Sequence, residues 1–95
     1  MEVMIVNLEN TVKMMTSNDF KERFIAEYYQ LKIRRSGLKN MLDKWKNGVL
    51  EFEPKCPFHL LHKQLLTMDE YLAVLEERAK IEGIDLVKEQ FNRRI

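Results

Sequence analysis

Basic side chains surround an apolar helical stripe in the first half of the chain, and they are the residues best suited to hold an anion. Arg35 lies within the stripe itself, where a guanidinium needs a carboxylate, a backbone acceptor or an anionic ligand. A carboxylate of the second helical segment, such as Asp69, would be its structural partner. The basic cluster is therefore either a solvated helix face or an anion site; its members are Lys32, Arg34, Arg35, Lys39, Lys44 and Lys46.

Cys56, His59 and His62 have the side-chain types that bind zinc. Only three ligands are present, and their spacing does not match a site built from two ligand pairs, so we expect no metal. The sequence contains no Ser-His-Asp set, phosphate-binding loop or glycine-rich fingerprint, and its carboxylates fall on predicted solvated faces. We therefore expect neither enzymatic activity nor a cofactor.

The composition predicts one small soluble domain. The 95 residues carry a net charge of +1, which argues against a general nucleic-acid-binding protein. A single cysteine excludes an internal disulfide and is typical of a reducing cytoplasm. The sequence shows no signal peptide and no apolar run long enough to span a membrane, so we expect a cytoplasmic protein.

Apolar residues recur every three or four positions in two long segments, which predicts two amphipathic helices. The first should span residues 19–47 and end before Gly48; the second should span residues 57–83, between Pro57 and Gly83. The first stripe is Phe24, Tyr28, Leu31, Arg35, Leu38, Leu42 and Trp45, and the second is Phe58, Leu61, Leu65, Met68, Leu72, Leu75 and Ala79.

The short connector at residues 48–57 predicts an all-α fold in which the two helices form an antiparallel, coiled-coil-like hairpin. Their charges favour this pairing, because residues 30–47 carry six basic side chains against one acidic, whereas residues 57–82 carry three basic against five acidic. Residues 1–16 should be a loose start followed by a short helix, and residues 84–95 a helical turn or a frayed tail. Gly37, inside the first helix, would mark close contact with another helix.

Each helix also carries a second, mixed stripe that a lone hairpin cannot bury. We therefore expect a homo-oligomer in which such stripes form polar pockets between subunits. The stripe of the first helix includes Ile25, Tyr29, Ile33 and Met41; that of the second is Leu60, Gln64, Thr67, Tyr71, Val74 and Arg78.

Two residue patterns resemble a family of small phage proteins. The first helix contains E-Y-x-x-L-x-x-R-x-x-x-L, beginning at Glu27, and the second contains Q-L-x-x-M-x-x-Y-L-x-x-L-E-x-R, beginning at Gln64. The resemblance covers residues 16–85 and includes a P-x-C-P element in the connector. The family is similar to the helical hairpins of phage sponges that defeat the CBASS and Thoeris defence systems.

The resemblance implies a cytoplasmic immune-evasion protein of the infected bacterial cell. Such sponges are oligomers, often hexamers, that sequester cyclic oligonucleotides or cyclic ADP-ribose isomers without catalysis. By resemblance, bases would stack on Tyr28 and Tyr29, of which Tyr29 is the better placed for a pocket, and phosphates would bind Lys32, Arg34 and Arg35. Arg78 joins these candidates through the mixed stripe. The alternative is a helical, anti-CRISPR-like inhibitor or adaptor that binds a host defence nuclease. The patterns leave open which cyclic nucleotide is bound.

Overall fold

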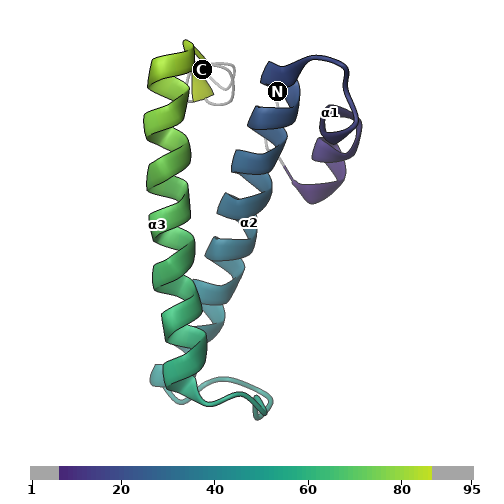
Figure 1. Cartoon of the computed structure of the whole chain (residues 1–95). Coiled ribbons are helices and arrows are strands. Elements are labelled where there is room, and N and C mark those ends of the chain that lie inside the picture. Colours follow the sequence, from purple (N-terminus) through teal and green to yellow (C-terminus); the bar gives the residue numbers. More distant parts are fainter. Residues whose placement is uncertain (1–6, 87–95) are drawn as a thin grey trace, which may run out of the picture.

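The computed structural model describes residues 7–86, in which helices joined by turns and an extended connector are present and no strand occurs (Figure 1). A 3₁₀ turn, η1 (Leu8–Thr11), leads into the short helix α1 (Val12–Met15). Two long helices follow, α2 (Phe20–Lys46) and α3 (Phe58–Glu82). They pack together, so the expected all-α fold with two long paired helices is confirmed. The expectations for residues 1–6 and 87–95 lie outside the described residues.

Local sequence signals explain where the long helices begin and end. Asp19 caps α2, because its side chain accepts a hydrogen bond from the Lys21 amide at 2.9 Å. Gly48 follows this helix with φ of 73°, and Gly83 ends α3 with φ of 74°, a left-handed conformation that glycine adopts at little cost. The sequence predicts helices at residues 19–47 and 57–83, and the structure gives each helix one residue less at either end.

Helices α2 and α3 are antiparallel, because the start of each helix contacts the end of the other. Arg78 covers Phe24 near one end, and the rings of Trp45 and Phe58 meet at 5.3 Å near the connector. The buried core lies mainly where the first half of α2 meets the second half of α3. It comprises Phe24, Ile25, Tyr28, Tyr29, Leu72, Leu75, Ala79, Ile84 and Leu86.

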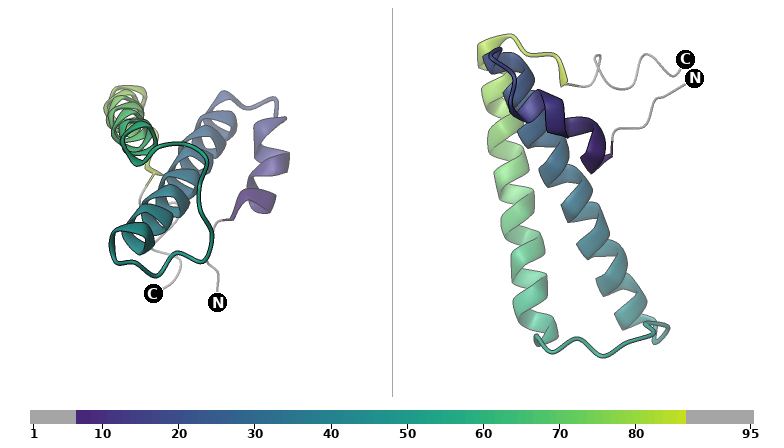
Figure 2. Two further views of the ribbon diagram at one scale, coloured as in Figure 1. Left: turned by 90° about the horizontal axis from the view of Figure 1, so that it is seen from below. Right: turned by 90° about the vertical axis from the view of Figure 1, so that its right-hand side faces the viewer.

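The N-terminal segment, η1 and α1, lies against α2 on the side away from α3 (Figure 2). The fully buried Thr11 hydroxyl donates to the Leu8 carbonyl at 2.7 Å and accepts from the Gln30 amide at 2.9 Å. Ile25 and Tyr29 are buried within the chain. The prediction that these two stripe residues need another subunit is therefore wrong, because the chain's own segments cover them.

Gly37 does not mark a close helix contact, contrary to the sequence-based expectation. A Cβ built at this position meets no atom within 4 Å among the residues described. Between residues 7 and 86, none of the helices combines the length and apolar character needed to cross a membrane.

Candidate ligand-binding groove

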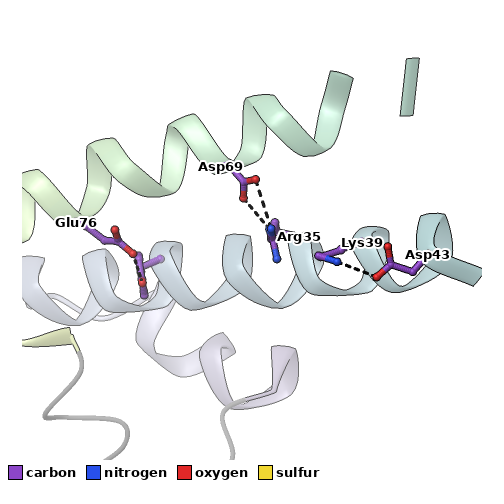
Figure 3. Close-up of polar contacts among 6 residues, drawn as sticks. Arg35, Lys39, Asp43, Asp69 and Glu76 are labelled. Carbon is purple, nitrogen blue, oxygen red and sulfur yellow. Dashed lines mark hydrogen bonds and ion pairs between the residues drawn. The ribbon is translucent and has the colours of Figure 1, made fainter. Parts of the chain in front are cut away.

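An ion pair between the two long helices forms the centre of the groove. Arg35 Nε donates to Asp69 Oδ1 at 2.7 Å, and Nη2 approaches Oδ2 at 3.4 Å (Figure 3). Hydrogen bonding to Asp69 raises the pKa of Arg35. This contact supplies the structural partner expected for a guanidinium within an apolar stripe. A guanidinium carries five N–H donors. The ion pair uses the Nε hydrogen and one Nη2 hydrogen, so both Nη1 hydrogens and the second Nη2 hydrogen point away from Asp69.

A cleft of about 290 Å³ opens beside this ion pair, and we call it the Arg35 cleft. Lys32 and Ser36 supply further donors from α2, one turn before and one residue after Arg35. Its complete lining is Lys32, Arg35, Ser36, Asp69, Leu72, Ala73 and Glu76. The cleft thus offers two cations and a hydroxyl group beside two carboxylates.

A larger cleft of about 610 Å³, here the Tyr28 cleft, adjoins the first and shares Ala73 and Glu76 with it. Tyr28 donates its hydroxyl hydrogen to Glu76 Oε2 at 2.7 Å. Burial, followed by this hydrogen bond, raises the pKa of Tyr28 well above its ordinary value. The complete lining is Tyr28, Ala73, Glu76, Glu77, Ala79, Lys80, Gly83, Ile84, Asp85 and Leu86.

The charges of the groove are arranged along its length. The Tyr28 cleft carries three carboxylates (Glu76, Glu77 and Asp85) and one lysine. In contrast, the Arg35 cleft has equal numbers of acidic and basic groups, and both of its basic groups come from α2, the helix that carries the excess of lysine and arginine. An anionic group is therefore favoured at the Arg35 end of the groove.

The structure brings three of the six predicted ligand residues together. Tyr28, Lys32 and Arg35 line the two adjoining clefts, and Lys32 Nζ lies 5.6 Å from the Tyr28 ring centroid. The Tyr28 ring is only 3% exposed, so little of its face is open to a ligand in this arrangement.

The other three predicted ligand residues lie apart from this group. Tyr29 is buried in the core and donates its hydroxyl hydrogen to the Leu86 carbonyl at 2.8 Å. Arg34 is exposed and lines neither of the two clefts. Arg78 places its guanidinium carbon 4.9 Å from the Phe24 ring centroid and pairs with Glu82 at 3.5 Å.

Sequence reasoning missed Ser36 and Glu76 as groove residues. Glu76 could have been found from the expected Arg35–Asp69 pair. In an antiparallel hairpin, the residue seven positions before Arg35 should lie opposite the residue seven positions after Asp69. These two residues are Tyr28 and Glu76, which are hydrogen-bonded in the structure. Ser36 has no comparable signal, because a serine on a helix flank has no periodic pattern of its own.

The Cys56, His59 and His62 set forms no metal site in the described part of the chain. No group of three histidine, cysteine, aspartate or glutamate side chains between residues 7 and 86 is placed to hold a metal ion. Cys56 is an exposed free thiol, and the His62 ring stacks on Phe58 with centroids 6.0 Å apart.

Comparison with protein families returns a match to the Sequestin family over residues 18–81, well over half of the chain. The chain belongs to the Sequestin family. Comparisons with curated proteins and with solved structures return no match. The Sequestin region contains all of α2 and nearly all of α3, and therefore both helices that form the groove. The η1–α1 segment lies before it.

Proposed function

We propose that this Sequestin protein is a phage immune-evasion protein that binds and sequesters a cyclic nucleotide messenger of bacterial defence without chemical conversion. The family name refers to sequestration, and the sequence patterns resemble those of the CBASS and Thoeris sponges. The observation that carries the proposal is the interhelical groove, in which Arg35, Lys32 and Ser36 offer donors at one end.

The chemistry of the groove suits a phosphate-bearing ring. Arginine pairs with phosphate oxygens through parallel N–H donors, and Lys32 adds a second positive charge on the same cleft. The Arg35 cleft is at the lower limit of small-molecule sites, which measure about 300–1,000 Å³. Together with the adjoining Tyr28 cleft of about 610 Å³, the groove provides room for a nucleotide beyond its phosphate.

Thermal unfolding in the presence of cyclic di- and trinucleotides and cyclic ADP-ribose isomers tests the proposal. A ligand that binds only the folded protein adds about 2.7 kcal/mol at a concentration a hundredfold above Kd. The melting temperature should therefore rise by several degrees or more with one member of the panel, and the ligand should be recovered chemically unchanged. Recovery of a hydrolysed product would contradict sequestration.

Arginine variants then locate the phosphate. Arg35→Ala should abolish the thermal shift, whereas Arg34→Ala, which removes a neighbouring exposed guanidinium outside the clefts, should retain it. The double variant Arg35→Ala/Asp69→Ala removes both charges and so keeps the protein from carrying an unpaired carboxylate. A normal shift in the double variant would exclude Arg35 as the phosphate ligand.

A second candidate function is the binding of a host defence nuclease by a helix face. The exposed stripe on α3 favours it, because Leu60 and Val74 are 50% and 56% exposed in the single chain. A folded protein that shows no shift with any cyclic nucleotide, yet retains a nuclease on an affinity column, would support this inhibitor over the sponge.

A further inference from the structure

The Tyr28 cleft carries a hydrogen-bond acceptor and a donor on one face of α3. Glu76 and Lys80 are four residues apart, so their side chains lie one helical turn from each other. Both line the cleft, and the apolar side chains of Ile84 and Leu86 form another part of its wall. The cleft therefore combines a polar edge with apolar surface, which is the combination that holds and orients a flat heterocyclic base.

Glu76 lies at the junction of the two clefts, because it lines both of them. Its Oε2 atom accepts the Tyr28 hydroxyl hydrogen at 2.7 Å, and Figure 3 shows its side chain directed from α3 toward α2. Tyr28 thereby orients the carboxylate. A carboxylate has about four lone-pair sites, so Glu76 can accept further hydrogen bonds from a ligand without losing the one from Tyr28.

We propose that the Tyr28 cleft binds a guanine base of the cyclic nucleotide, whose N1–H and 2-amino groups donate to Glu76 and whose O6 accepts from Lys80. This inference rests on the proposed function, because a phosphate at Arg35 sets the position of the base. Glu76 follows Asp69, the partner of Arg35, by seven residues, and seven residues of α-helix rise by about 10 Å. That length is comparable to the span from the phosphate of a nucleotide to the Watson–Crick edge of its base.

The order of acceptor and donor on the cleft favours guanine over the other bases. Guanine presents two adjacent N–H donors, which a carboxylate can accept as a pair, next to a carbonyl oxygen that suits an ammonium group. In the same orientation, adenine would direct its N1 acceptor at Glu76 and its amino group at Lys80, so neither contact would form. Uracil has a single N–H between two carbonyl oxygens and therefore cannot supply the paired donors.

Isothermal titration calorimetry of the wild-type protein tests the base preference with defined ligands. Cyclic di-GMP should bind about tenfold or more tightly than cyclic di-AMP, because a bidentate contact to a base edge discriminates by about this factor. Cyclic di-IMP lacks only the 2-amino group of guanine and should bind about tenfold more weakly than cyclic di-GMP. This second comparison isolates one donor of the base without altering the protein.

Variants of α3 test which side chains read the base. Glu76→Gln replaces one acceptor oxygen by a donor and should reduce the preference for cyclic di-GMP over cyclic di-AMP about tenfold. Lys80→Met removes the donor to O6 and should weaken cyclic di-GMP more than cyclic di-AMP. Glu70→Gln is the matched control, because Glu70 is exposed on the same helix and lines neither cleft; it should leave both affinities unchanged. Circular dichroism checks that each variant remains helical.

The outcomes distinguish this inference from the proposed function. Equal affinity for cyclic di-GMP and cyclic di-AMP, a preference for cyclic di-AMP, or a guanine preference that Glu76→Gln leaves intact would overturn the guanine assignment while sequestration stands. Absence of binding to every cyclic nucleotide would overturn both. A guanine preference that falls in Glu76→Gln and persists in Glu70→Gln supports the assignment.

Discussion

Arg35 contributes to helix packing and is also the proposed phosphate ligand. Its ion pair with Asp69 links α2 to α3, yet the two side chains are 27% and 41% exposed. Solvent at this exposure screens the charge interaction, and partly exposed ion pairs contribute little to the free energy of unfolding. Arg35 can therefore meet a ligand phosphate without a large loss of hairpin stability.

A double-mutant cycle measures how much the pair contributes to folding. Urea unfolding of wild type, Arg35→Ala, Asp69→Ala and the double variant should give a coupling energy of at most about 1 kcal/mol. A coupling above roughly 3 kcal/mol would be that of a buried structural pair. In that case, Arg35 would be unavailable to a phosphate.

The three tyrosines should resist alkaline titration while the protein is folded. Burial raises the pKa of Tyr28 and Tyr29, and the hydrogen bond to Glu27 raises that of Tyr71, all from an ordinary value of 10.0. A higher pKa in the folded state means that the folded protein holds the proton more tightly. This stabilisation is complete below pH 10 and is lost as the pH rises above it.

Ultraviolet absorbance and circular dichroism, followed together from pH 8 to 13, check this expectation. Tyrosinate absorbance should increase together with the loss of helicity. In Tyr28→Phe, the Glu76 hydrogen bond is absent, so this variant should be less stable at neutral pH by about 0.5–1.5 kcal/mol. Ionisation of all three tyrosines near pH 10 in a fully helical protein would contradict the assigned environments.

At the scale of helices, two glycines should respond oppositely to alanine. Gly37→Ala adds a methyl group in open space within α2 and should stabilise the protein by about 0.5–1 kcal/mol. Gly83→Ala forces a β-carbon into a left-handed conformation at the end of α3 and should destabilise it by about 1–2 kcal/mol. Thermal unfolding should separate the two variants by several degrees. A lower melting temperature for Gly37→Ala would show that an unseen partner packs there.

The sequence predicted the helices well because their signals are local. Asp19, Gly48 and Gly83 form caps through their own residue chemistry, and the heptads follow from periodicity alone. The groove was only partly predictable. The Arg35–Asp69 pair follows from register, whereas the burial of Tyr29 depends on long-range contacts with Leu86, which periodicity does not encode.

At the scale of the whole molecule, α2 lies between two helical layers, the N-terminal segment and α3. The N-terminal segment covers one side, where Met14 packs against the buried core. Helix α3 covers the other side (Figures 1 and 2). Its exposed stripe runs along the flank of the hairpin, where Tyr71 donates to Glu27 of α2 and Arg78 covers Phe24. The N-terminal segment and α3 therefore cover opposite sides of α2, and a substitution in the N-terminal segment should leave the contacts between α2 and α3 in place.

Substitutions in α1 test this separation. Met14→Asp places a charge against the core and should lower the free energy of unfolding by about 1–3 kcal/mol. Val12→Asp, in the same short helix but 57% exposed, should change it by no more than about 0.5 kcal/mol. Urea unfolding measures both. Equal destabilisation by the two aspartates would contradict the docking of Met14.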